Sequence, residues 1–312
     1  MFEYSVAFAV VLFPQFCVYS QYVFADNTGL STAVDAWITD EGAATATYGF
    51  ISTWDVAQVT SMSGLFTNKV TFNGDIGGWD VSSVTTMHSM FRSAYVFNAD
   101  ISSWNVSSVE NMVYMFRDAA AFNADIRLWD VSSVTAMSDM FGGASSFNAN
   151  IGNWDVSSVN SMSSMFYGAT SFNADIGNWD VSNVQGCRQM FRSASSFNAN
   201  IGHWNVNKIT DMSHTFYGAS SFNQQLCWDV AGKIVTEMFT GTNCASIIVC
   251  VPSSSPTSQP TQDSSFKKHF KDEVKGVMSY IKDSIFQISS GTRSSIKSFK
   301  HAIQPPGYNE DL

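Results

Sequence analysis

The chain has 312 residues, of which 45 % are hydrophobic, enough apolar material for a continuous core. Only 13 % are charged, about half the ~25 % of an average globular protein. The formal net charge of −10 argues against nucleic acid as a partner, since proteins that bind nucleic acid carry basic patches.

Residues 1–25 have the pattern of a secretory signal peptide. An apolar run, Val6–Phe13, precedes small residues at Ser20 and Ala25, and cleavage after either one fits this pattern. The alternative is a short membrane anchor, but the run falls short of the ~20 residues that a span needs and Pro14 interrupts it. The sequence therefore predicts a secreted protein or one at the extracellular surface.

The middle of the chain is a tandem repeat. Tryptophan recurs every 25 residues, at positions 54, 79, 104, 129, 154, 179 and 204, and again at 228 after one deletion. Seven units span 54–227, and a truncated eighth spans 228–239. A period of 20–50 residues is typical of solenoids, which grow by stacking units and do not split into domains.

Each unit contains two apolar spacings. In the unit that begins at Trp129, the residues Val134, Met137, Met140 and Phe141 lie three, three and one apart, which favours a short helix. Apolar and polar residues alternate across 147–151, which favours a short strand. The predicted fold class is α/β, a right-handed solenoid of seven to eight 25-residue coils with one short parallel strand and one short helix per coil.

The segments on either side of the repeats differ from them in composition. Residues 26–53 are predicted to form an N-terminal cap, because Leu30, Val34, Trp37 and Ile38 have helical spacing. The other predicted boundaries are 54–251 for the repeats with a C-terminal cap, 252–263 for a Ser/Pro/Thr linker and 264–312 for a basic amphipathic helical tail. That tail either docks on the repeats, pairs with itself or touches a membrane surface.

Of the five cysteines, Cys17 lies in the predicted signal peptide and the other four fall into two groups. Cys187 takes the place of a core methionine, so we expect a buried free thiol. Cys227, Cys244 and Cys250 gather at the end of the repeats, where a disulfide is expected in a secreted protein. Cys227–Cys244 is the favoured pair, although spacing alone does not determine connectivity.

Two columns of aspartate run along the repeats. The first follows the tryptophans and is predicted to cap turns, because Asp accepts hydrogen bonds from backbone amides two residues on. The second consists of Asp75, Asp100, Asp125 and Asp175. If these carboxylates lie side by side on a sheet, their repulsion must be offset either by backbone and serine donors or by bridging calcium ions.

A binding face should vary between coils while the core stays constant. The position after the helical phenylalanine varies in this way, and Tyr114 and Arg188 lie near it in the unit. Tyrosine and arginine are enriched at interface hot spots, although an ordinary solvated surface is the alternative. The candidate binding residues are Arg92, Arg117, Tyr167, Arg192, Tyr217, Tyr114 and Arg188.

The repeat motif Trp-Asp-Val-Ser-Ser-Val-Thr-x-Met-x-x-Met-Phe resembles that of the BspA-like leucine-rich-repeat surface proteins. It is especially similar to the repeat of unknown function first described in mycoplasma lipoproteins, and the resemblance covers residues 51–239. It implies a leucine-rich-repeat-like fold, a secreted or surface location, and a role in adhesion or protein binding, with no defined ligand.

The sequence contains no enzyme signature, since its five histidines share no spacing and it has no phosphate-binding glycine loop or zinc helix. We therefore expect a monomeric protein that binds an extracellular protein or glycan without catalysis. The alternative is a structural, matrix-type protein whose acidic rows bind calcium. A carbohydrate-active enzyme on a parallel β-helix would need paired carboxylates at non-repeating positions, and the sequence offers none.

Overall fold

The structure is a computed structural model that describes residues 21–243. They lie within the first of the chain's two compact units, Met1–Val251. Residues 1–20 of the predicted signal peptide, Cys244 and Cys250, the predicted linker at 252–263 and the predicted tail at 264–312 lie outside the described residues.

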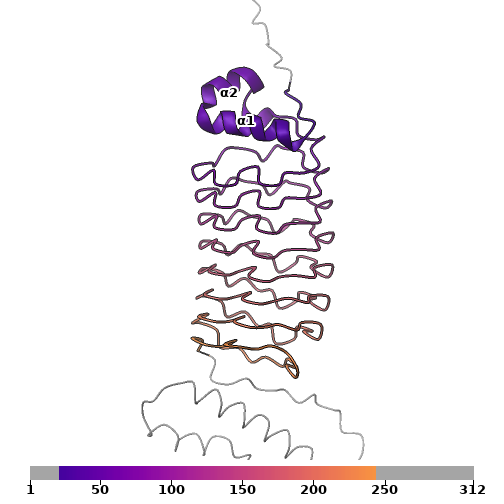
Figure 1. The fold of residues 1–312 in the computed structure, drawn as a ribbon, viewed down its shortest axis with the longest axis vertical. Coiled ribbons are helices and arrows are strands. Elements are labelled where there is room, and N and C mark those ends of the chain that lie inside the picture. The colour runs from indigo at the N-terminus through magenta and orange to yellow at the C-terminus, as the bar shows by residue number, and fades with distance from the viewer. Residues whose placement is uncertain (1–20, 244–312) are drawn as a thin grey trace, which may run out of the picture. The chain divides into compact units, whose positions relative to one another are not determined.

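Two helices stand at the N-terminal end of the repeats (Figure 1). Helix α1, Asn27–Thr39, begins after Asp26, whose carboxylate accepts the first-turn amide of Gly29 at 2.9 Å. Helix α2, Glu41–Tyr48, begins after Asp40 in the same manner. A short 3-10 turn, η1, Ile51–Thr53, leads into the first coil.

Helix α1 joins the core of the repeats and confirms the helix expected from the apolar spacing at 30–38. Leu30 and Val34 are fully buried in the same cluster as the coils. Trp37 packs edge-on against Trp54, and Asn27 Nδ2 donates to the carbonyl of Ser63 in the first coil at 3.2 Å. The helix therefore covers apolar surface and also provides a donor to the end of the stack.

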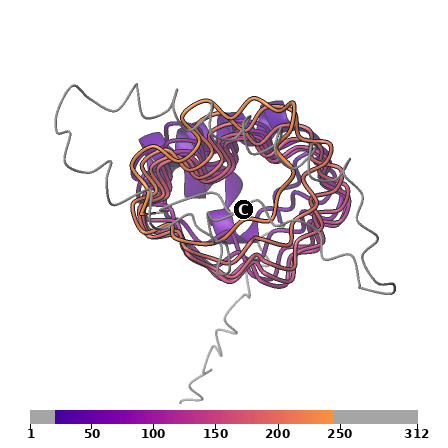
Figure 2. The ribbon, with the colours of Figure 1, turned by 90° about the horizontal axis from the view of Figure 1, so that it is seen from below.

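The repeats form coils that lie one above another (Figure 1) and enclose a common interior when seen along the stack (Figure 2). The repeated Trp, Val, Met, Phe, Ala and Ile side chains fill that interior and are nearly all less than 5 % exposed. In each coil two phenylalanine rings stack closely, as Phe116 and Phe122 do at 3.7 Å between centroids. Similar stacking continues between coils, with 5.7 Å from Phe116 to Phe141 and 5.9 Å from Phe122 to Phe147.

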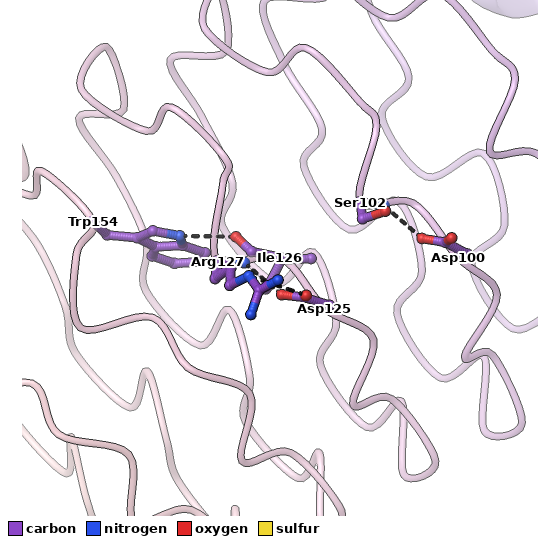
Figure 3. A network of polar contacts seen from close by, with 6 residues as sticks. All are labelled: Asp100, Ser102, Asp125, Ile126, Arg127 and Trp154. Carbon is purple, nitrogen blue, oxygen red and sulfur yellow. Dashed lines mark hydrogen bonds and ion pairs between the residues drawn. The ribbon is translucent and has the colours of Figure 1, made fainter.

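The tryptophans hold consecutive coils together through a polar contact as well. Each indole N–H from Trp79 to Trp228 donates to the carbonyl of the isoleucine three residues before the preceding tryptophan, at 2.8–3.2 Å. Trp154, for example, donates to Ile126 (Figure 3). A buried indole N–H without an acceptor would cost about 1–3 kcal/mol, so this contact ties the tryptophan to its place in the coil.

The segment predicted as a helix forms successive turns instead. Its backbone is left-handed, with positive φ, at two places in each coil, the tenth and fourteenth residues after the tryptophan. The first set is Gly64, Ser89, Tyr114, Asp139, Ser164, Gln189 and His214, continued by Glu237 in the shortened last coil. The second set is Asn68, Ser93, Asp118, Gly143, Gly168, Ser193 and Gly218, continued by Gly241.

The left-handed residues redirect every second amide along the stack. In the coil that contains Tyr114, the amides of Met112, Tyr114 and Phe116 donate to carbonyls of the next coil at 2.9–3.0 Å. The intervening amides, such as that of Met115, close turns of three residues within the coil. In an α-helix all these amides would donate to carbonyls of the helix itself. The predicted helix is therefore wrong here, although the spacing of its apolar residues is right.

The predicted strand at 147–151 also lacks regular pairing in the described residues. The coils are joined there by asparagine side chains, since the amide of Asn173 donates to Asn148 Oδ1 at 2.8 Å and that of Asn148 to Asn123 Oδ1 at 2.8 Å. The parallel bridges between successive coils lie elsewhere, in most units one residue before the first methionine, as between Ala136 and Ser161. Parallel contact between coils is therefore present, but in the segment predicted as a helix.

The indole contact leads to a first prediction. Trp129→Phe should lower the free energy of unfolding by about 2–4 kcal/mol, because it opens a cavity and leaves the Ile101 carbonyl without its buried donor. Urea titration followed by circular dichroism measures this loss. The neighbouring Leu128 is 80 % exposed, so Leu128→Ser should cost less than about 0.5 kcal/mol. Equal losses in the two variants would contradict the assigned role of Trp129.

Candidate functional site

The outer surface differs between the two long sides of the coil. The phenylalanine at the twelfth position meets the next tryptophan across the interior, with 6.3 Å between the rings of Phe116 and Trp129. The residues that flank the tryptophans and those that flank these phenylalanines therefore belong to opposite walls. The aspartates after the tryptophans belong to the first wall, and the candidate Arg and Tyr residues belong to the second.

We call the second wall the Arg/Tyr face and define it by Arg92, Tyr114, Arg117, Tyr167, Arg188, Arg192 and Tyr217. Four of the five arginines between residues 21 and 243 belong to it, although the chain as a whole is acidic. The left-handed residues lie among these positions, and the core side chains on either side of them point inward. The coil geometry thus leaves these positions free to vary without disturbing the interior.

The structure gathers three candidates into an upper cluster. The guanidinium carbon of Arg92 lies 5.6 Å from the centre of the Tyr114 ring, and that of Arg117 lies 5.4 Å from the same ring. Such cation–π contacts contribute about 0.5–1 kcal/mol each at exposed sites. Arg117 also donates to Asp139 at 2.6 Å and lies 3.6 Å from Asp118. Its charge is therefore largely matched within the chain.

The two carboxylates of this cluster were not among the predicted site residues. Gly142 and Gly143 interrupt the side-chain column in the next coil, and Asp139 and Asp118 reach toward the space that side chains would occupy there. Burial raises the pKa of the Asp139 carboxyl, opposed by Arg117 and reinforced by the charge of Asp118. The sequence signal that could have found them is their place in the two left-handed columns, where Asp, Asn and Gly recur.

Three other candidates form a lower cluster. Arg192 lies between two tyrosines of the neighbouring coils, with its guanidinium carbon 5.8 Å from the Tyr167 ring and 4.8 Å from the Tyr217 ring. Arg188 is exposed. Burial raises the pKa of the nearby Asp211, but the hydrogen bonds from Ser213 and the charges of Arg188 and His214 together bring it below its ordinary value. His214 lies 3.4 Å from Glu237 at the edge of this cluster.

The aspartates that are candidate calcium ligands accept hydrogen bonds from the local backbone. Asp75, Asp100, Asp125 and Asp175 each accept the amide two residues on, at 2.9–3.2 Å. Asp125 also pairs with Arg127 at 3.3 Å (Figure 3). Within residues 21–243 no three Asp, Glu, His or Cys side chains come close enough together to hold a metal ion. Of the two ways to offset repulsion between these carboxylates, the structure provides backbone and side-chain donors.

The aspartates after the tryptophans confirm the prediction of turn capping. Asp80 and Asp130 each accept both the hydroxyl and the amide of the serine two residues on. The serine hydroxyl is the main cause that lowers the pKa of each carboxyl, followed by the backbone amide. Asn105 makes the same contacts with Ser107, so the carboxylate charge is not required at this position.

The cysteines described by the structure differ in state. Cys187 is a buried free thiol as predicted, and burial raises its pKa to about 12, so it is not a reactive thiolate at neutral pH. Cys227 is disulfide-bonded, and its partner lies outside the described residues. The favoured partner Cys244 thus stays a prediction.

A family model describes most of the chain. The model described as "Mycoplasma protein of unknown function, DUF285" matches residues 40–152 and again residues 143–246. The chain belongs to the DUF285 family. The two matches cover helix α2 and the coils, and the family's description assigns no activity.

Searches of curated proteins and of solved structures found no match to this DUF285 chain. In the part of the chain that the structure describes, neither α1 nor α2 is long and apolar enough to span a bilayer.

The opposite pKa shifts of two carboxyls lead to a second prediction. Asp139 holds its proton more tightly when folded, so its contribution to stability falls as pH rises from the ordinary Asp pKa through the raised one. Asp139→Asn removes that loss and keeps an oxygen for Arg117 in a residue that tolerates the left-handed backbone. Relative to the native chain, the variant should therefore be more stable at about pH 7 than at about pH 2.5 in urea titrations.

The matched control is Asp80→Asn, because Asn occurs naturally at this position in Asn105 and Asn205. The lowered pKa of Asp80 stabilises the folded state above the ordinary Asp pKa, and this contribution is lost as pH falls. Relative to the native chain, Asp80→Asn should lose stability between about pH 2.5 and pH 7. The same pH trend in both variants would contradict the assigned electrostatics.

Proposed function

We propose that this DUF285 chain is a secreted or cell-surface protein that binds another macromolecule, an extracellular protein or a glycan, without catalysing a reaction. The observation that carries the proposal is the concentration of arginine on the Arg/Tyr face of an otherwise acidic chain. Arg and Tyr are residue types enriched at binding hot spots. Their mutual stacking reduces the side-chain freedom that a partner would otherwise have to restrict.

Two further features support this proposal. The core columns repeat almost without change while the Arg/Tyr face varies from coil to coil, as expected of a scaffold that presents a specific surface. The motif also resembles that of BspA-like leucine-rich-repeat surface proteins, which implies adhesion or protein binding and a leucine-rich-repeat-like right-handed solenoid.

The proposal is tested by charge reversal on the face. Full-length chain is applied to arrays of immobilised extracellular proteins and glycans, and binding is compared with that of the double variant Arg92→Glu/Arg192→Glu. We expect bound partners to be lost or weakened by at least about 10-fold, because both sites change from attraction to repulsion. Arg117 is left unchanged, since its replacement would disturb Asp118 and Asp139.

The matched control is Arg127→Glu/Lys208→Glu, which changes the net charge equally at exposed positions away from the face. It should keep the partners of the native chain. Equal binding by both double variants, or no partner in either array, would contradict the proposed function.

If the chain is secreted, contacts of residues 22 and 24 with the first coil favour one of the two predicted cleavage sites. Tyr22 and Phe24 pair with Asp55 through two backbone hydrogen bonds of 2.9 Å, and Phe24 is buried. Cleavage after Ala25 would remove both residues from the first coil, whereas cleavage after Ser20 keeps them. The secreted chain should therefore begin at Gln21, as measured by N-terminal sequencing, and a start at Asp26 would contradict this assignment.

A further inference from the structure

Arg192 differs from the other arginines of residues 21–243 because its charge neither forms an ion pair with a carboxylate nor shifts the pKa of one. Among residues 21–243, Arg117 pairs with Asp118 and Asp139, and Arg127 pairs with Asp125. The charge of Arg92 acts on Asp139 and that of Arg188 on Asp211. No ion pair within this part of the chain involves Arg192, and no shifted carboxyl there responds to its charge.

The surroundings of Arg192 hold the guanidinium in place without neutralising it. Tyr167 and Tyr217 approach it from the coils before and after its own. Contacts with ring faces restrict a guanidinium but leave the N–H groups at its edge free to donate. A guanidinium held in this way is suited to bind a carboxylate through two parallel hydrogen bonds.

The charges along the face favour a protein segment over a polyanionic glycan. The coils that contain Gly142 and Tyr167 have no cation on this face, so a regularly charged chain would meet gaps. Asp139 and Glu237 lie in the same left-handed column as Tyr114, and Asp211 lies near Arg188. These carboxylates would repel a chain of closely spaced anions. An isolated acidic side chain, surrounded by neutral groups, avoids both penalties.

We propose that Arg192, held between Tyr167 and Tyr217, is an anchor that binds the carboxylate of an acidic residue in a protein partner. This inference rests on the proposed function, because it names the chemistry of the partner at the same face. The tyrosines act as positioning residues and present further apolar area around the contact.

The experiment follows the Nε–H signals of the arginines by NMR in the full-length chain labelled with ¹⁵N-arginine. The probes are the peptide acetyl-Gly-Glu-Gly-amide, its counterpart with Gln in place of Glu, and a heparin-derived disaccharide. We expect the Glu peptide to shift the Arg192 signal in a saturable manner and the Gln peptide to leave it unchanged. The signal of Arg127, already paired with Asp125, is the internal reference.

Two substitutions of Tyr217 separate the effect of the aromatic ring on Arg192 from that of an apolar side chain without a ring. Tyr217→Leu should lower the affinity for the Glu peptide by roughly 2- to 5-fold, because it removes one cation–π contact. Tyr217→Phe keeps the ring, so its affinity should lie within about 2-fold of that of the native chain. Assigned spectra of both variants report whether they fold.

The proposal is overturned if Arg192 responds no more than Arg127, if the disaccharide binds more tightly than the Glu peptide, or if both Tyr217 variants bind equally. A saturable Arg192 response with no partner on the arrays would remove the proposed function and leave the carboxylate site. Array partners that survive Arg192→Gln would remove the carboxylate site and leave the proposed function.

Discussion

The stack depends on a backbone feature, the left-handed residue that recurs twice in every coil. Without it, the amides between the first methionine and the alanine of each unit would donate to carbonyls of their own segment, as in a helix. With it, every second amide points to the next coil while the others close turns within their own coil. A coil with little regular secondary structure thus pairs its backbone groups, which a buried backbone requires. This arrangement also places the two Phe columns and the Trp column in register.

The interior and the outer face have separate requirements. The interior needs the same ring in the same place in every coil, because stacked phenylalanines and the indole contact reach into neighbouring coils. The outer positions beside the left-handed residues carry Arg, Tyr, Gly or Ser in different coils. The outer surface can therefore vary on this scaffold while the interior stays constant. The two arginine–tyrosine clusters, with the Asp118 and Asp139 carboxylates in the upper one, are one such variation.

Several elements were predictable from the sequence and others were not. The tryptophan period predicted units that share one core, and the spacing from Leu30 to Ile38 predicted helix α1. The helix and strand within each coil were wrong, because apolar residues three apart also suit successive turns, and asparagine side chains replace strand pairing. The columns of Gly, Asn, Asp and Ser at the fourteenth position carried the missing signal, since these residues tolerate positive φ. At the face, residue type and variability singled out arginines and tyrosines that the structure brings into contact, and their role in binding stays a prediction. The pairing of Arg117 with Asp118 and Asp139 depended on the stacking of coils, which spacing alone does not reveal.

The most direct test of this account compares valine at two adjacent, half-exposed serines, Ser163 and Ser164. Ser164 has φ of 56°, whereas Ser163 is not among the residues with positive φ, and valine already occupies its column at Val113. A β-branched residue in the left-handed region costs about 1–3 kcal/mol. Ser164→Val should therefore lower the free energy of unfolding by about that amount, while Ser163→Val should stay within about 0.5 kcal/mol of the native chain. Equal, small effects at both positions, as in an ordinary helix, would contradict the account.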